Sequence, residues 1–374
     1  MASFCPTGCQ GAPVSSTKYG APGATPIQPS GAAPGARKER GADGDVCAIF
    51  SLRGIGRWFA GLRRPGSLPG KAGSAPRMQA IYAQPTLVED LRSAVNERLD
   101  SLVPAAQRGP QRVTEAVRYA LLAPGKRIRP LLTLLAAVDF GAAVADALDV
   151  ACATEMVHTA SLVLDDLPSM DDARLRRGQP TVHVAYGEST AILAAVALLN
   201  QAFATVTRAT RLPCETRLAL VERLSAAVGF DGLVTGQEHD LHDRGNTATV
   251  ARLEALNHQK TSVLFEAALE IGARVAGAAD RSIDELRQVA AHLGLAYQIA
   301  DDLFDVSVPL GPQSKDLHKD ADKPTVVSIL GAERARERFG HHMAEALKLL
   351  PARGAGGQPL RDYIVVTFAQ TRLC

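Results

Sequence analysis

Apolar residues recur at intervals of three and four positions from Met78 onward, while the alternation typical of strands is scarce. Thr86 to Val103 shows this pattern, and Thr86 lies three residues before Glu89, the spacing of a capping box. Several later segments are apolar on most faces, which predicts an all-α bundle with helices buried inside it. After 86–103, helices are predicted at 113–122, 128–138, 144–166, 188–208, 214–229, 248–277, 281–306 and 332–349.

No segment of this pattern is expected to cross a membrane. The most apolar runs, Leu131 to Val138 and Ala191 to Leu199, fall far short of the ~20 residues that a bilayer requires. The cysteines lie at positions 5, 9, 47, 152, 214 and 374, without the spacing of a zinc site or disulfide framework and without a secretory signal. A reducing, cytoplasmic location is therefore expected.

Composition sets residues 1–77 apart from residues 78–374. The first stretch holds 14 of the 32 Gly and 9 of the 22 Pro, and 10 Lys or Arg against 3 Asp or Glu. We predict a low-complexity, disordered N-terminal extension followed by one helical domain. That domain carries 31 basic against 36 acidic side chains, so it lacks the positive charge needed to follow a nucleic-acid backbone. No nucleic-acid partner is expected.

Three interpretations of the extension stay open. Val46 to Arg64 mixes apolar residues with four arginines, as a basic interfacial helix does. Translation beginning near Met78 is the second interpretation. The third is a transit peptide of the plastid type, because the stretch is rich in arginine and poor in acids.

The strongest chemical signal is LDDLPSMDD, residues 164–172. Pro168 disfavours helix at the residue before it, so Asp165 and Asp166 belong to the last helical turn. The partial negative charge at a helix C-terminus opposes carboxylates there. Each like-charged pair also costs roughly 4 kcal/mol at about 4 Å before screening. A bound cation is therefore predicted at this segment.

A second acidic cluster follows in QIADDLFD, residues 298–305. In a helix, Asp301 and Asp305 lie one turn apart, and Gln298 precedes Asp301 on the same side. Oxygen ligands at this density suit a hard cation such as Mg²⁺. A solvated acidic helix end is the alternative for one such cluster, but two clusters in apolar helices favour a metal.

Basic residues accompany both clusters. GKRIRP, residues 125–130, places three cations in four residues, and Arg174, Arg176 and Arg177 follow the first acidic segment. Guanidinium groups bind phosphate oxygens in forked pairs, and lysine supplies a compact charge. Acids alternating with bases predict a metal-bridged phosphate. An ordinary solvated surface is the alternative for lysines such as Lys260 and Lys315.

The order of these motifs resembles that of the trans-isoprenyl diphosphate synthases, and most of all the bacterial geranylgeranyl diphosphate synthases of carotenoid pathways. The resemblance spans about residues 86–349. It implies an isoprenoid-synthase-type helical bundle around a central cavity, in a homodimer, with the two Asp motifs facing across its mouth. The motifs that carry it are GKRIRP, MVHTASLVLDDLPSMDDARLRRGQPT, GQEHDL, HQKTSVLFEAA, YQIADDLFD and KDLHKDADKPT.

The resemblance implies a metal-dependent site with Mg²⁺, or Mn²⁺ in its place, at three ions per active site. The implied metal ligands are Asp165, Asp171 and Asp301, with Asp166 in support and Asp302 also among the catalytic residues.

The same resemblance implies two diphosphate substrates, isopentenyl diphosphate and an allylic partner that is dimethylallyl, geranyl or farnesyl diphosphate. The residues implied for isopentenyl diphosphate are Lys126, Arg129, His158 and Arg177. Those implied for the allylic side are Arg176, Lys260, Thr261, Gln298 and Lys315. His158 lies seven residues before Asp165, hence on the same helix face and about 10 Å deeper.

The implied reaction is chain elongation, in which the allylic carbon–oxygen bond breaks and the double bond of isopentenyl diphosphate attacks the resulting cation. Ala160 and Ser161 lie five and four residues before Asp165 and are small, where farnesyl-producing relatives commonly carry an aromatic side chain. A C20 product is therefore expected rather than C15. Met156, Val157 or a neighbouring helix is the alternative floor.

Other functions stay open. A farnesyl or longer-chain polyprenyl synthase would use the same motifs. A terpene cyclase also ionises allylic diphosphates, but it pairs one Asp-rich motif with an Asn/Ser/Glu metal motif, whereas the second motif here is DDLFD. A non-catalytic partner subunit would be expected to have lost some of the acids or bases named above.

Overall fold

The computed structural model describes residues 85–104, 111–242, 249–307, 324–350 and 358–369. The chain divides into two units after Lys71, and every described residue belongs to the second unit. The predictions made for residues 1–77, including the helix at Val46 to Arg64, lie outside the described residues, as does the candidate site residue Lys315.

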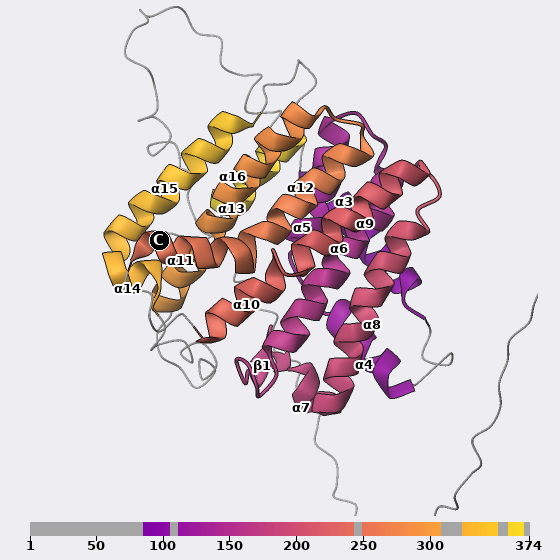
Figure 1. Ribbon diagram of the computed structural model, residues 1–374, viewed down its shortest axis with the longest axis horizontal. Helices are drawn as coiled ribbons and strands as arrows, with labels where there is room; N and C mark the ends of the chain where they lie inside the picture. The colour runs from indigo at the N-terminus through magenta and orange to yellow at the C-terminus, as the bar shows by residue number, and fades with distance from the viewer. Residues whose placement is uncertain (1–84, 105–110, 243–248, 308–323, 351–357, 370–374) are drawn as a thin grey trace, which may run out of the picture. The chain divides into compact units, whose positions relative to one another are not determined.

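Helices make up nearly all of the described structure, so the all-α prediction is confirmed (Figure 1). The first helices are α3 (Pro85–Leu102), α4 (Gln111–Leu121), α5 (Ile128–Asp139), α6 (Val144–Asp165), α7 (Val182–Tyr186), α8 (Glu188–Thr207), α9 (Cys214–Val228) and α10 (Leu233–His242). They are followed by α11 (Val250–Asn257), the π-helical turn η3 (His258–Ser262), α12 (Val263–Val275), α13 (Asp280–Ser307), α14 (Val326–Leu330), α15 (Ala332–Leu349) and α16 (Pro359–Ala369). A short antiparallel hairpin pairs β1 (Leu175–Arg176) with β2 (Gln179–Pro180).

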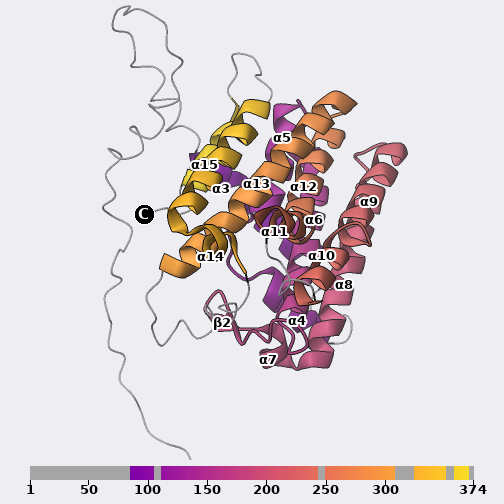
Figure 2. The same cartoon turned by 60° about the vertical axis from the view of Figure 1, so that its left-hand side comes forward.

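Helices α5, α6 and α12 form the centre of the bundle. They lie between α8 and α9 on one side and α13 and α15 on the other in both views (Figures 1 and 2). Ten of the twelve residues of α5 and ten of the thirteen residues of α12 are buried. The prediction of helices that are apolar on most faces and enclosed by others is thereby confirmed. Such burial follows from the hydrophobic effect, the main stabilising term in folding.

The first helix begins slightly earlier than the capping-box pattern predicts. Helix α3 starts at Pro85, so Thr86 lies within its first turn rather than at the N-cap. Proline is favoured at the first helical position because the amide hydrogen that it lacks would have no partner there.

By length and composition, two described helices are long and apolar enough to span a membrane, so the expectation that no segment crosses one is not confirmed. In α6 the apolar window is 67% buried inside the bundle, and in α8 it is 44% buried. The uninterrupted apolar runs in the sequence are short, but small residues such as Ala and Thr extend the apolar stretch of both helices. A core helix meets the same criterion, so this finding assigns neither helix to a membrane.

Glu270 of α12 is the centre of an ion network that joins three helices. Its side chain is 1% exposed and accepts hydrogen bonds from Arg223 Nε at 2.6 Å, Arg274 Nε at 2.8 Å and Arg287 Nη2 at 2.8 Å. Burial alone raises the pKa of Glu270, but these guanidinium groups outweigh it and lower the pKa to about 2.

Replacing Glu270 by Gln is expected to make the free energy of unfolding depend less on pH in the acid range. A carboxylate whose folded pKa is depressed stabilises the fold above its unfolded pKa, near 4.5, and loses that contribution as pH falls towards 2. The contribution is about 3 kcal/mol, because each pKa unit corresponds to 1.36 kcal/mol. Urea unfolding between pH 7 and pH 3 measures it. Glu345→Gln, which removes only a surface pair with Lys348, is the control. Parallel pH curves for wild type and Glu270→Gln would contradict the assignment.

Candidate active site

The first acidic motif lies where α6 ends. Helix α6 stops at Asp165, and Asp166 is its C-cap, as the position of Pro168 predicts. The chain then turns back, and the backbone N–H of Asp171 donates to the carbonyl of Asp165 at 2.9 Å. This bond satisfies a carbonyl that the helix end would leave unpaired, and it brings the two predicted metal ligands of this motif together.

The side chain of Asp165 has an unusual protonation equilibrium. Burial raises its pKa to about 6, and the charges of Asp171 and Asp166 add to that effect, while Lys260 and Arg176 oppose it. An acidic side chain that holds its proton up to this pH is short of positive charge. The position therefore suits a further cation.

Asp166 serves a different purpose from its neighbour. Its side chain is almost fully buried and accepts a forked pair of hydrogen bonds from Arg176, with Nη2 at 2.6 Å and Nε at 2.8 Å. Arg176 belongs to β1, and the hairpin holds it over the end of α6. Asp166 therefore orients Arg176, the residue expected at the allylic diphosphate, and its supporting role in metal binding stays a prediction.

The basic loop before α5 presents one buried and one exposed cation of the predicted isopentenyl diphosphate set. Lys126 is exposed. Arg129 is buried, its guanidinium lies 4.7 Å from the centre of the Phe265 ring, and its Nη1 lies 3.3 Å from His158 Nε2. In the part of the chain that the structure describes, the Nε–H of Arg129 has no hydrogen-bond partner. Such a donor is costly to bury unless an acceptor arrives.

His158 is held in its neutral form. Burial lowers its pKa well below the usual range, and the charges of Arg129, Arg177 and Arg176 lower it further. A neutral imidazole can donate a hydrogen bond to an anion without a charge of its own. His158 is therefore compatible with the predicted diphosphate site.

Backbone strain marks the charged loops. Among the described residues other than glycine, positive φ angles occur at Arg127 (50°), Asp172 (46°) and Arg177 (54°). Left-handed backbone costs an ordinary L-residue roughly 1–2 kcal/mol and persists where surrounding contacts impose it. Arg127 belongs to the basic loop, Asp172 ends the first acidic motif and Arg177 lies in the hairpin turn, so strain and charge coincide.

Arg177 closes the basic loop onto the hairpin. Its Nη1 donates to the carbonyl of Pro124 at 3.0 Å. A Cβ at Gly125 would lie 2.5 Å from the same nitrogen, so a larger residue there would push the Arg177 guanidinium aside. The structure thus brings Arg177 against the GKRIRP loop, as its predicted place at isopentenyl diphosphate requires.

The second acidic motif divides into an outward and an inward aspartate. Asp301 is exposed, and its charge acts on Arg129 and Tyr297, which places it near the basic loop. Asp302 is buried, where it accepts from Gln298 Nε2 at 3.1 Å and from the backbone N–H of Val326 at 3.3 Å. Asp302 was expected among the catalytic residues, but its contacts anchor Gln298 and the start of α14. The side chain of Asp305 lies outside the described residues.

Lys260 and Thr261 extend from the π-helical turn η3 towards both motifs. Lys260 Nζ lies 2.6 Å from Asp240 Oδ2, and its charge lowers the pKa of Asp165. Thr261 Oγ1 donates to Gln298 Oε1 at 3.3 Å. The turn η3 therefore places Lys260 near the acidic end of α6 and Thr261 against Gln298 of the second motif.

The acids fit a metal that arrives with phosphate. No group of three or more His, Cys, Asp or Glu side chains in the described ranges is arranged to hold a metal ion by itself. Mg²⁺ is usually bound by one or two carboxylates together with waters and substrate phosphates. Asp165 and Asp171, which the turn after α6 brings together, match that type of site.

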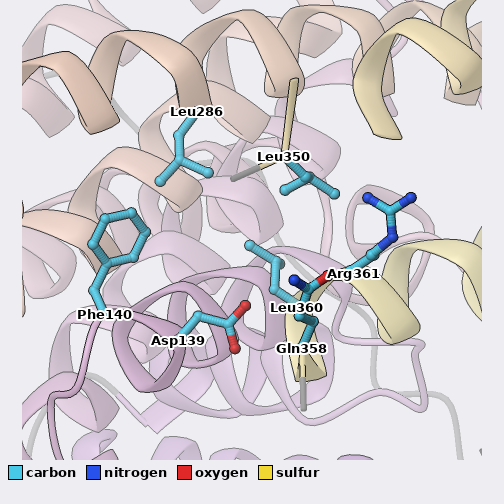
Figure 3. Close-up of a pocket in the computed structure, with 7 residues that line it drawn as sticks. All are labelled: Asp139, Phe140, Leu286, Leu350, Gln358, Leu360 and Arg361. Carbon is cyan, nitrogen blue, oxygen red and sulfur yellow. The ribbon is translucent and has the colours of Figure 1, made fainter. Parts of the chain in front are cut away.

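The chain-length candidates lie below the first motif. Ala160 is fully buried in the core, and Ser161 is partly buried with its hydroxyl donating to the carbonyl of His158 at 2.9 Å. The predicted central cavity is a different place from the pocket drawn in Figure 3, which lies at the end of α5 remote from Arg129. Ten residues along α5 separate Asp139 from Arg129, a distance of about 15 Å. That pocket is lined by Asp139, Phe140, Leu286, Leu350, Gln358, Leu360 and Arg361.

Sequence reasoning missed several residues that hold the site together. Asp240 pairs with Lys260, and Gln237 Nε2 contacts Met170 Sδ at 3.6 Å in the first acidic loop. Both belong to the GQEHDL motif, whose pattern alone does not indicate which of its residues make contacts. Glu155, which pairs with Arg127 at 2.8 Å, lies in an apolar stretch of α6, where an isolated acid is the available signal.

Comparisons with known proteins agree with one another. The sequence profile of the family described as Polyprenyl synthetase matches residues 110–351. The geranylgeranyl diphosphate synthase of Pseudescherichia vulneris is 41% identical over 300 residues, which cover 80% of this chain and 94% of that protein. The farnesyl diphosphate synthase of Geobacillus stearothermophilus is 41% identical over 276 residues, covering 73% and 90%.

A solved structure supports the same relationship. The apo structure of an FPP/GFPP synthase from Zymomonas mobilis matches with a TM-score of 0.68 at 33% identity, covering 77% of this chain and 99% of that chain. The resemblance drawn from the order of the motifs is therefore confirmed, and so is the fold class that it implied.

Proposed function

Because this chain belongs to the polyprenyl synthetase family, we propose that it makes geranylgeranyl diphosphate from isopentenyl diphosphate and a shorter allylic diphosphate. It is a prenyltransferase that elongates prenyl chains. The observation that carries the diphosphate site is Arg129, a buried cation with an Nε–H that has no partner among the described residues, beside a neutral histidine. A phosphate oxygen is the acceptor that this arrangement lacks.

The residues divide the work of the reaction between two diphosphates. Arg129, His158, Lys126 and Arg177 bind and orient isopentenyl diphosphate, and the apolar ring of Phe265 backs Arg129. Once the allylic carbon–oxygen bond has broken, the double bond of this substrate attacks the resulting cation, and the proton lost from the new chain passes to the released pyrophosphate.

The allylic diphosphate lies nearer the acids. Arg176, held by Asp166, and Lys260, held by Asp240, offset its negative charge. Asp165, Asp171 and Asp301 would hold Mg²⁺, which when bound neutralises the departing pyrophosphate and so lowers the barrier to ionisation.

The direct test is product analysis with purified protein. Incubation with Mg²⁺, labelled isopentenyl diphosphate and each of dimethylallyl, geranyl and farnesyl diphosphate should give a C20 diphosphate by mass. Dimethylallyl diphosphate alone should give no hydrocarbon product, whereas a cyclase would not need the second substrate. A C15 end product would replace the proposed function with farnesyl diphosphate synthesis.

Replacing Ala160 by Tyr is expected to shorten the product from C20 to C15. The phenol would occupy the space on the α6 face below Asp165 into which the chain grows. Overpacking a buried site costs about 1–3 kcal/mol, so products are compared per amount of folded enzyme. Ala226→Tyr, on an exposed part of α9, is the control. Unchanged C20 output from Ala160→Tyr would exclude this position as the limit.

A second copy of the chain is proposed to cover the outer face of α8. Ile192, Leu193 and Val196 are 45%, 55% and 49% exposed within little more than one turn. Val196→Glu is expected to shift the protein from dimer to monomer in light scattering, because a charge would then be buried at the contact. Val366→Glu, an exposed valine on α16, should leave the dimer intact. A wild-type monomer would contradict the proposal.

A further inference from the structure

Lys260 and Thr261 stand on an irregular piece of backbone. The turn η3 interrupts the run from α11 to α12, and the backbone N–H of Val263 donates to the carbonyl of His258, five residues earlier. Such π-helical turns are rare and occur mostly as single turns inside α-helices, because an extra residue must be accommodated. The helices packed against η3 must therefore fit its backbone closely if the side chains of η3 are to keep one orientation.

Two glycines on neighbouring helices fit the turn closely. A Cβ at Gly236 of α10 would lie 2.5 Å from the backbone nitrogen of Lys260. A Cβ at Gly294 of α13 would lie 2.1 Å from Ser262 Oγ and 2.5 Å from Ser262 Cα. Backbone atoms cannot yield as a flexible side-chain end can, so any larger residue would displace η3. Both glycines are in α-helices, where glycine is unfavourable by roughly 1 kcal/mol relative to alanine.

Each glycine is followed four residues later by the polar partner of the turn. Asp240, one helical turn after Gly236, pairs with Lys260 Nζ at 2.6 Å. Gln298, one turn after Gly294, accepts from Thr261 Oγ1 at 3.3 Å. Residues four apart lie on the same helix face. Both neighbouring helices therefore use the same arrangement: a glycine admits the backbone of η3, and the next turn holds a side chain of η3.

We propose that Gly236 and Gly294 are positioning residues that seat the π-helical turn so that Lys260 and Thr261 meet the allylic diphosphate. This role rests on the proposed function. It assigns the two glycines to one substrate, because their polar partners Asp240 and Gln298 contact the η3 side chains and the isopentenyl diphosphate residues come from α5, α6 and the hairpin.

The test compares Gly236→Ala and Gly294→Ala with Gly272→Ala. A Cβ at Gly272 would lie 2.2 Å from the carbonyl oxygen of Thr133, the same kind of clash at the crossing of α12 with α5, away from η3. We expect Gly236→Ala and Gly294→Ala to lower kcat/KM for the allylic substrate by about 10²-fold, the effect of misplacing catalytic groups by about 1 Å. The KM for isopentenyl diphosphate should stay within about twofold, because the residues proposed to bind this substrate do not lie on η3. Gly272→Ala should lower the melting temperature without this split.

Amide hydrogen exchange at residues 258–263 gives a readout that needs no turnover. Exchange there should be faster in Gly236→Ala and Gly294→Ala than in wild type and unchanged in Gly272→Ala. Asp240→Asn, which keeps the shape of the side chain, should show the same kinetic split if either glycine variant fails to fold. Two results would overturn the positioning role alone. One is wild-type kcat/KM for the allylic substrate in these variants. The other is an equal fall in kcat/KM for both substrates, as in Gly272→Ala. A wild-type protein that elongates no allylic diphosphate would overturn the proposed function and this role together.

Discussion

Asp165→Asn is expected to lower the rate of prenyl transfer by roughly 10³-fold, because a metal site supplies several kcal/mol of charge stabilisation and each 1.36 kcal/mol is a factor of ten. The carboxylate lies at the end of α6, beside Asp171 and short of positive charge. The amide keeps the shape of the side chain and removes its charge. The loss should therefore appear in turnover and in the Mg²⁺ concentration needed for half-maximal rate, with the fold retained.

A matched substitution in the same loop separates this effect from general damage. Asp172 is exposed and has a left-handed backbone, which asparagine adopts readily. Asp172→Asn should leave the rate within about threefold, because no metal role rests on it. Steady-state rates over a Mg²⁺ titration measure both variants. Equal losses in the two variants, or an Asp165→Asn enzyme with the wild-type Mg²⁺ requirement, would argue against Asp165 as a ligand.

Most of the fold follows from periodicity. The predicted ranges 128–138, 188–208 and 332–349 match α5, α8 and α15 within one residue at each end. These helices bury one face or all faces, so the positions of their apolar residues report the structure directly. The short helices α7 and α14 escaped prediction, because five residues are too few to show a period of 3.6.

One predicted helix conceals the most informative feature. The range 248–277 was predicted as continuous, whereas the structure has α11, the turn η3 and α12 in succession. A π-helical turn adds one residue without breaking the helix, so the apolar pattern resumes with a small shift in phase. The close contacts to the turn come from Gly236 on α10 and Gly294 on α13. A local sequence pattern cannot show contacts between residues so far apart in the chain.

In the site too, the sequence indicates which residues take part but not which residues they pair with. Sequence motifs indicated candidate acids and bases, and in the structure Lys260 lowers the pKa of Asp165 while Asp301 raises that of Arg129. They could not indicate that Asp302 faces inward or that Arg176 is bound by Asp166, because a pair of adjacent aspartates must point in different directions along a helix. Partner choice depends on tertiary packing.

Arg127 shows how much of the site depends on a group that binds no substrate. Its side chain is 2% exposed, and each of its three nitrogens donates a hydrogen bond: Nε to Asn96, Nη1 to Glu155, and Nη2 to the carbonyls of Leu121 and Ala123 at 2.9 and 3.0 Å. These bonds fasten the end of α4, α3 and α6 around the basic loop.

Arg127→Met is expected to cost about 3–5 kcal/mol of unfolding free energy, because it leaves the carboxylate of Glu155 buried without its partner. Methionine has the same Cβ, so the backbone strain at φ 50° stays as it is. The double variant with Glu155→Leu should recover part of the loss, since it removes the unpaired charge, while the carbonyls of Leu121 and Ala123 still lack their donor. Arg118→Met, which breaks an exposed pair with Asp100, should cost no more than about 1 kcal/mol. Urea unfolding of the four proteins measures these differences. If Arg127→Met costs no more than Arg118→Met, or if the double variant shows no recovery, the buried pair does not hold the loop.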